Sequence, residues 1–196
     1  MDNKCVTVAM TGASGSIYGI RLIEELLSSG IHVSLVLSDA ASLVIKEETS
    51  MDWASEEHIK DHFKRKSGLS YFSNKNFFSP LASGSSCPST MVIAPCSMGT
   101  LGRIAGGISS NLIERAADVV LKEKGKLILL PRETPMNDIH LENMLKLSRM
   151  DAVIVPAMPG FYHNPKTIDD LINFVVGKLL DQIGIEHNLF KRWGEK

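Results

Sequence analysis

The sequence has little aromatic character, few cysteines and almost no net charge. Aromatic residues make up 6% of its 196 residues, and the formal net charge is −1. A chain so nearly neutral gives no electrostatic reason to expect a nucleic acid or an anionic membrane as a partner. Its three cysteines follow no CxxC or metal-finger spacing, which predicts free thiols in a reducing compartment.

Long apolar runs are absent as well. No stretch approaches the roughly 18 apolar residues that span a bilayer, and no charged segment leads into an apolar signal segment at the start. With 44% hydrophobic and 22% charged residues, the composition is that of a globular protein with a sizeable core. The sequence therefore predicts a cytoplasmic protein with neither a nucleic-acid nor a membrane partner.

Strand-like and helix-like segments alternate along the chain. Short runs rich in Val, Ile and Leu, each bounded by turn residues, predict buried strands at 5–10, 31–38, 90–95, 126–131 and 151–157. Apolar stripes at helical spacing predict helices at 17–27, 111–124 and 168–183. The alternation predicts an α/β fold, with a single doubly wound, mostly parallel sheet of Rossmann or flavodoxin-like type and helices on both faces. We expect one domain over residues 1–196.

Residues 49–88 are the least regular part of this domain. Their first half, at 55–66, has the charge density of a solvated helix, and their second half, at 73–89, is rich in Ser, Asn and Gly. Such a segment is either a surface excursion or a lid over a ligand, and the sequence leaves both open.

The loop after the first strand, "TGASGS", is rich in small residues. It is not the dinucleotide fingerprint GxGxxG, because Ser14 stands where the second glycine would be, and the chain has no P-loop GKS or GKT. Gly12, Gly15 and Gly19 allow a tight turn, a close approach of the backbone to an anion and close helix packing. The loop favours a phosphate on the amides at the helix N-terminus over a plain structural turn.

The loop after the third predicted strand, "CSMGT", repeats this theme with hydroxyls at Ser97 and Thr100, although helix capping alone would explain Ser97. A dinucleotide-binding fold has an acidic residue at the end of a strand, about 20 positions beyond the first glycines, that binds the ribose. Here Ser38 stands near that position, with Asp39 beside it. Two anion-friendly loops without a ribose ligand favour a mononucleotide over NAD.

Charged residues follow the fourth predicted strand in "PRETP". Arg132 can bind a phosphate through bidentate hydrogen bonds, while Glu133 can transfer protons. Alternatively, the two residues form a surface ion pair that contributes little to stability. Arg115 and Lys122 are seven residues apart on the preceding helix and so share one face, which a solvated charged surface would also explain.

Two other constellations carry little weight. His58 and His62 have the i, i+4 spacing of metal ligands, but the segment between them lacks the HExxH glutamate and is densely charged. No Ser–His–Asp arrangement follows from the spacing, so nucleophilic hydrolysis has no support.

Several motifs, in order along nearly the whole chain, carry a specific resemblance. They are "MTGASGSIYGIRL", "SGSS", "PCSMGTL", "NLIERAADVVLKE", "LLPRETP", "IHLENMLKLS", "PGFYHNP" and "RWGE". Together they resemble the UbiX-type flavin prenyltransferases. The resemblance implies homo-oligomers, commonly dodecamers with sites shared between subunits. It also implies transfer of a dimethylallyl group from dimethylallyl phosphate, or the diphosphate, to N5 and C6 of reduced FMN without a metal. The prenylated FMN would serve a UbiD-type decarboxylase.

Carried onto this chain residue by residue, the family pattern assigns three groups of positions. FMN would be bound by Gly12, Ala13, Ser14, Ser38, Ser97, Met98, Gly99, Thr100 and Arg132. Dimethylallyl phosphate would meet Tyr162 and Lys178. The positions around the reacting groups are Glu48, Arg115, Lys122, Glu133 and Trp193. Many members have arginine where this chain has Lys178, which leaves the choice between a monophosphate and a diphosphate donor open.

The implied chemistry fits these residue types. Without an Asp-rich Mg²⁺ motif, cationic side chains would neutralise the departing phosphate, Glu133 would exchange protons, and aromatic faces would shelter the allyl cation. Two rivals remain. An FMN-dependent oxidative decarboxylase of cysteine substrates would share Pro135-Met136-Asn137, but the MW that should follow is missing. A non-catalytic flavin-binding subunit would not need the residues around the reacting groups.

Overall fold

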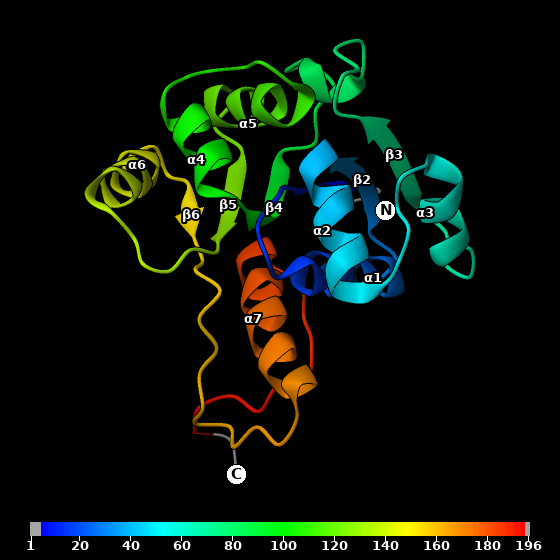
Figure 1. Cartoon of the computed structure of the whole chain (residues 1–196), viewed down its shortest axis with the longest axis vertical. Helices are drawn as coiled ribbons and strands as arrows, with labels where there is room; N and C mark the ends of the chain where they lie inside the picture. The colour runs from blue at the N-terminus through cyan, green and yellow to red at the C-terminus, as the bar shows by residue number, and fades with distance from the viewer. Residues whose placement is uncertain (1–4, 195–196) are drawn as a thin grey trace.

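The computed structural model describes residues 5–194 and is built on one parallel sheet. Within these residues the sheet has six strands in the order β3-β2-β1-β4-β5-β6 (Figure 1). The strands are β1 (Cys5–Met10), β2 (His32–Leu37), β3 (Leu69–Ser73), β4 (Thr90–Cys96), β5 (Lys126–Pro131) and β6 (Val153–Ile154). All five pairings are parallel, so the predicted doubly wound α/β fold is confirmed. The strand order reverses between β1 and β4, and ligands bind at such switch points.

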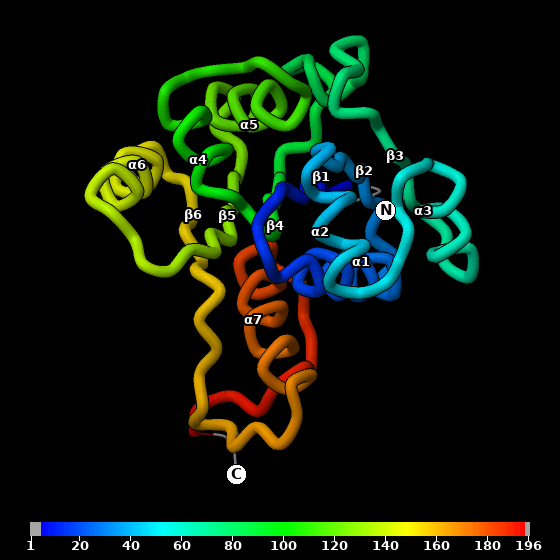
Figure 2. The backbone as a smooth tube through the Cα atoms, viewed as in Figure 1, coloured from blue at the N-terminus to red at the C-terminus, as the bar shows by residue number. Residues whose placement is uncertain are grey.

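Helices cover both faces of the sheet. They are α1 (Ser16–Ser28), α2 (Asp39–Thr49), α3 (Glu56–His62), α4 (Met98–Ala105), α5 (Leu112–Lys122), α6 (Asp138–Ser148) and α7 (Ile168–Ile183), with a 3₁₀ turn η1 (Pro80–Ala82). α1 and α7 pack together on one face, and α4 contacts both α5 and α6 on the other (Figure 1). Figure 2 shows α7 and the segments on either side of it extending away from the sheet as an arm.

The core lies in two apolar layers because the strands are buried on both sides. Alternate side chains of one strand point to opposite faces, so Val8 joins one layer and Ala9 the other, both with 0% exposure. Helix α1 approaches the sheet closely at Gly19, where an added β-carbon would lie 2.2 Å from the Ala94 carbonyl oxygen. Only glycine lets α1 pack this tightly on β4 beside the switch point.

Most predicted elements are confirmed, with β5 and α7 matching residue for residue. Thr167 caps α7 and Asp170 completes a capping box with it. The last strand is shorter than the predicted 151–157. The amides of Val155 and Ala157 still donate to β5, so hydrogen bonding to β5 continues beyond the two residues assigned to the strand.

The structure adds elements that the sequence did not indicate. β3 lies within the irregular 49–88 segment as an edge strand paired with β2. α2 and α6 bury few residues, so their apolar stripes are weak. The helix predicted at 55–66 is confirmed in part as α3. The 3₁₀ turn η1 packs against α5. Among the described residues, every helix is too short or too polar to cross a membrane.

Candidate active site

Thr11 joins the two loops at the switch point. Its side chain is 2% exposed, and its Oγ1 donates to the carbonyl of Pro95 at 3.0 Å and accepts from the amide of Ser97 at 2.7 Å. The loop after β1 and the loop after β4 therefore form one unit, which brings Gly12–Ser14 beside Ser97–Thr100. A threonine ending an apolar strand gave no sequence signal for this role.

Two predicted ligand-binding serines cap helices at this edge. Ser97 is the N-cap of α4, accepts from the amide of Thr100 at 3.3 Å and donates to the Thr100 hydroxyl at 3.1 Å. Ser38 caps α2 and its amide donates to the carbonyl of Met10 at 3.0 Å, which ties the end of β2 to the end of β1. The capping explanation of Ser97 is thus confirmed, and it leaves the hydroxyls at the edge where a ligand would bind.

Glu48 occupies the N-terminus of α1. Its carboxylate accepts from the amide of Gly15 at 3.0 Å, the amide of Ser16 at 2.8 Å and the Ser16 hydroxyl at 2.7 Å. Burial by itself raises the pKa of Glu48, but hydrogen bonds from Ser14, Ser16 and Gly15 outweigh it and lower the pKa. In this structure a carboxylate of the chain accepts from the amides on which the sequence places a ligand phosphate, so the phosphate position stays a prediction.

Arg132 reaches the same loop from the end of β5. Its Nε donates to the carbonyl of Ser14 at 3.3 Å, and the amide of the next residue, Gly15, donates to Glu48 at 3.0 Å. Glu133 follows directly, with Oε1 accepting from the amide of Thr134 at 3.0 Å. The structure thus brings together Ser14, Glu48 and Arg132, and places Glu133 at the same edge.

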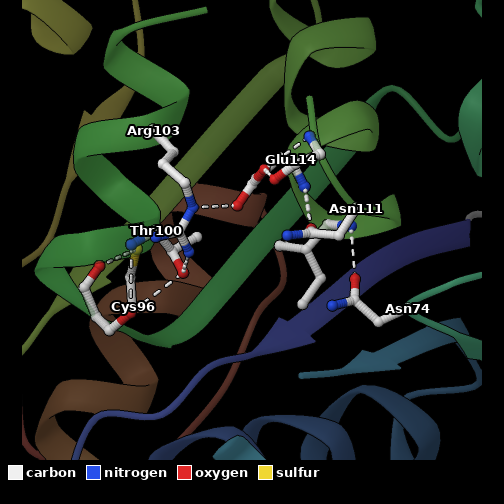
Figure 3. A network of polar contacts seen from close by, with 9 residues as sticks. Asn74, Cys96, Thr100, Arg103, Asn111 and Glu114 are labelled. Atoms are coloured by element: carbon white, nitrogen blue, oxygen red, sulfur yellow. Dashed lines mark hydrogen bonds and ion pairs between the residues drawn. The ribbon is translucent and has the colours of Figure 1, made fainter. Parts of the chain in front are cut away.

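An ion pair between a buried carboxylate and a partly exposed arginine supports the Ser97–Thr100 loop (Figure 3). Glu114 is 0% exposed and accepts from Arg103 Nε at 2.5 Å and from the hydroxyl of Ser110 at 2.6 Å. Arg103 also donates to the Thr100 hydroxyl at 3.3 Å. Burial raises the pKa of Glu114, but hydrogen bonds from Arg103 and Ser110 outweigh it and lower the pKa. The pair links α4 to the start of α5, and sequence spacing gave no sign of it.

Arg115 and Lys122 share one face of α5, as their spacing predicted. Arg115 donates to the carbonyl of Ala82 at 3.1 Å, and Lys122, which pairs with Glu123, lies near Gly84. α5 runs toward the start of β5, so Lys122 lies at the amino edge of the sheet, opposite the loops just described. Within residues 5–194, no hydrogen bond joins either cation to those loops.

The predicted donor-binding residues lie on the arm. The Tyr162 and Trp193 rings meet edge to face with centroids 5.3 Å apart, and Trp193 is 81% exposed. Lys178 Nζ lies 5.6 Å from the Phe174 ring, which also contacts Tyr162. A cavity of about 500 Å³ opens between 162–164 and 191–194. Tyr162, Trp193 and Lys178 are therefore brought together.

The histidines with metal-ligand spacing are used in packing and ion pairing. His62 packs edge-on against Trp53, with ring centroids 5.3 Å apart, and His58 lies 4.0 Å from a carboxylate oxygen of Asp52. No group of three or more His, Cys, Asp or Glu within 5–194 could hold a metal ion.

We expect Glu48→Ala to lower the free energy of unfolding by about 1 kcal/mol, because two amides and a hydroxyl lose a charged acceptor that is itself exposed to solvent. The folded-state pKa is lowered, so this stabilisation is complete above the unfolded pKa of about 4.3 and is lost as the pH falls through the folded pKa. Chemical denaturation from about pH 7 to about pH 2 measures it, with exposed Glu47→Ala as the control. A deficit that did not change with pH would contradict the assignment.

Comparison with known protein families shows the class to which this chain belongs. A family model described as Flavoprotein matches residues 1–180. The parallel sheet, its switch-point loops and this match define a flavin-binding α/β protein.

More similar relatives narrow the class. The flavin prenyltransferase UbiX of Alkalihalophilus pseudofirmus is 57% identical over 194 residues, covering 98% of this chain and 97% of its own. AnUbiX, solved in complex with FMN and dimethylallyl pyrophosphate, has a TM-score of 0.89 and 36% identity and covers 99% of both chains. A dodecameric FMN-dependent UbiX-like decarboxylase from Escherichia coli O157:H7 has a TM-score of 0.88 and 40% identity, covering 97% of this chain and 100% of its own. The chain belongs to the UbiX flavin prenyltransferase family.

Proposed function

We propose that this flavin prenyltransferase joins a dimethylallyl group from dimethylallyl phosphate to N5 and C6 of reduced FMN, closing a fourth ring. The observation that carries the proposal is the junction of Ser14, Glu48 and Arg132 at the switch point, with Glu133 beside it. A protein that only bound flavin would need the loops but not this second carboxylate. Reduced FMN, when bound, supplies the nucleophilic ring atoms.

The residues at the carboxyl edge of the sheet fit FMN. Hydroxyls of Ser38, Ser97 and Thr100 and the guanidinium of Arg132 are groups that bind phosphate and ribityl oxygens. The chain approaches closely there, since a β-carbon at Gly12 would lie 2.5 Å from that of Ala40. The other FMN positions proposed are Ala13, Ser14, Met98 and Gly99.

Leaving-group departure is the step that these charges would assist. Breaking the allylic C–O bond places the bonding electron pair on the phosphate and leaves an allyl cation. Arg132, Lys122 and Lys178 would stabilise the growing negative charge, and Glu133 would give a proton to the leaving phosphate and later help to remove one from the flavin. The faces of Tyr162 and Trp193 would shelter the cation.

Completion of the site would require a second copy of the chain. Arg115 and Lys122 lie on α5, and Lys122 is at the far edge of the sheet, so a neighbouring copy would bring them to these loops. α6 exposes apolar side chains that an assembly would cover, including Ile139, Leu141 and Leu145. We propose a homo-oligomer, a dodecamer as in the Escherichia coli relative.

The remaining partners follow from the chemistry. The prenylated FMN would be consumed by a UbiD-type decarboxylase. The cationic side chains would replace a metal in neutralising phosphate, so the reaction would proceed without one.

The cysteines bear on the cellular compartment. Cys5, Cys87 and Cys96 are free thiols, which suits the cytoplasm.

An anaerobic incubation tests the proposal. The protein is mixed with reduced FMN and dimethylallyl phosphate, and the molecular mass of the released flavin is determined by mass spectrometry. We expect a flavin heavier by one prenyl unit, and the diphosphate is then compared as donor. Tightly bound but unmodified FMN, with both donors and intact oligomers, would refute the reaction.

A further inference from the structure

Asp181, on the last turns of α7, binds the C-terminal segment. Its two carboxylate oxygens accept from the guanidinium of Arg192 at 2.7 and 3.2 Å, and Nε2 of His187 lies 3.2 Å from Oδ1. The His187 side chain is only 3% exposed. A bidentate, charge-assisted pair of this kind fixes both distance and orientation. One carboxylate therefore holds two positions of the segment that follows α7.

The same carboxylate lies beside the lysine that we assign to the donor. Lys178 Nζ is 4.0 Å from Asp181 Oδ2, and it lies 5.2 Å from the centre of the Phe190 ring, while the Arg192 guanidinium is 5.8 Å from that centre. Lys178 and Arg192 thus share one carboxylate and one ring. At 4.0 Å from Oδ2, Lys178 Nζ lies beyond hydrogen-bond distance of Asp181, whereas the Arg192 guanidinium lies within it.

Close packing reinforces these polar contacts. A β-carbon at Gly177 would lie 2.5 Å from the Phe190 ring and 2.6 Å from the His187 ring. The segment therefore presses against α7 where only a glycine leaves room. Next along the chain from Arg192 is Trp193, whose ring contacts Tyr162. The position of Trp193 thus depends on how the preceding residue is anchored.

We propose that Asp181 is a positioning residue for the donor site, holding Arg192 so that Trp193 stays against Tyr162 beside Lys178. The proposal rests on the proposed function, which assigns those three side chains to dimethylallyl phosphate. Burial raises the pKa of Asp181, but bonds from Arg192 and His187 outweigh it and lower the pKa, so the anchor is ionised at neutral pH. Asp181 itself touches no reacting atom.

Asp181→Asn in the full-length oligomer tests this role. We expect KM for dimethylallyl phosphate to rise on the order of tenfold, because the side chains that bind the donor are no longer held in place. The affinity for FMN should be unchanged, because Asp181 does not hold the loops that bind the flavin. Asp181→Glu keeps the charge and should recover part of the loss. Asp61→Asn is the matched control, since Asp61 also pairs with a cation three residues along, Lys64, but on the remote α3–β3 segment.

A second readout does not need turnover. The chain has two tryptophans, and Trp53 is 2% exposed, so a Trp53→Phe background makes Trp193 the reporter. Because Trp193 is already 81% exposed, we expect Asp181→Asn to lower the fluorescence anisotropy of Trp193 rather than to expose it further, and to weaken donor binding in a fluorescence titration. Gly177→Ala should do the same through steric displacement, with every charge retained.

The outcomes separate this proposal from the reaction itself. A wild-type protein that forms no prenylated FMN refutes the proposed function, and the titration still decides whether Asp181 governs donor binding. Unchanged KM and unchanged donor affinity in Asp181→Asn would overturn the positioning role, whether or not Trp193 became more mobile. A loss of FMN affinity equal to the loss of donor affinity would also overturn it, because it would indicate a general structural defect.

Discussion

Glu133→Gln should lower the rate of prenyl transfer on the order of a hundredfold, about 3 kcal/mol in activation free energy, while FMN still binds. Glutamine keeps the size of the side chain and its acceptor oxygen toward the amide of Thr134, but it has no proton to exchange. Single-turnover formation of prenylated FMN under anaerobic conditions measures the rate. Glu57→Gln, on the remote and exposed face of α3, is the control. Normal turnover would remove Glu133 from acid–base catalysis.

Mixed oligomers extend this test to the shared site. Lys122→Ala should be as impaired as Glu133→Gln, and each variant alone should be nearly inactive. If one copy contributes Glu133 and a neighbour contributes Lys122, random mixing during co-expression restores both groups in about one quarter of the sites. Activity should therefore reappear in co-expressed oligomers. Failure to recover it, with mixing verified by mass, would show that both residues act within one copy.

Arg103→Ala should lower the free energy of unfolding by about 3 kcal/mol, because it leaves the carboxylate of Glu114 buried without its cation. Glu114 is 0% exposed and keeps only neutral donors such as Ser110 in the variant. Urea denaturation of the assembled protein measures the loss. Arg65→Ala, an exposed arginine after α3, should change the free energy of unfolding by less than about 0.5 kcal/mol.

The pH dependence of that difference has a definite sign. The lowered folded-state pKa of Glu114 means that its contribution to stability is present above the unfolded pKa of about 4.3 and is lost as the pH falls through the folded value. The gap between wild type and Arg103→Ala should therefore narrow in acid, where the carboxylate is neutral in both proteins. A gap that stayed constant from about pH 7 to about pH 2 would show that Arg103 acts through packing.

The sequence predicted the elements whose physical signals are local. β5 and α7 are long apolar patterns with clear ends, so both were located to the residue. β3 was missed because it is a half-buried edge strand between polar segments, without a continuous apolar run. α6 was missed because it buries only Leu147. Local pattern fails where an element depends on its neighbours for burial.

The candidate site was predictable in the same uneven way. The rule that ligands bind beyond the carboxyl ends of strands located Ser97 and Arg132 from the sequence alone. The partners that fix them were not predictable, because Thr11 meets Ser97 across 86 positions and Asp181 acts only through the folded arm. Glu48 came from family resemblance, and only the structure shows that its carboxylate accepts from the first amides of α1.

The carboxylate at the start of α1 also bears on how the chain folds. Gly15, the N-cap of α1, has no side chain to cap the helix, and the acceptor for its amide comes from Glu48, 33 positions later on α2. During synthesis the first helix therefore emerges with its leading amides satisfied only by water until the second helix has been made. A fragment ending at β2 would contain the glycine-rich turn without the residue that completes it. This glycine-rich turn is thus a product of tertiary folding, since its own strand–turn–helix unit does not contain all its parts.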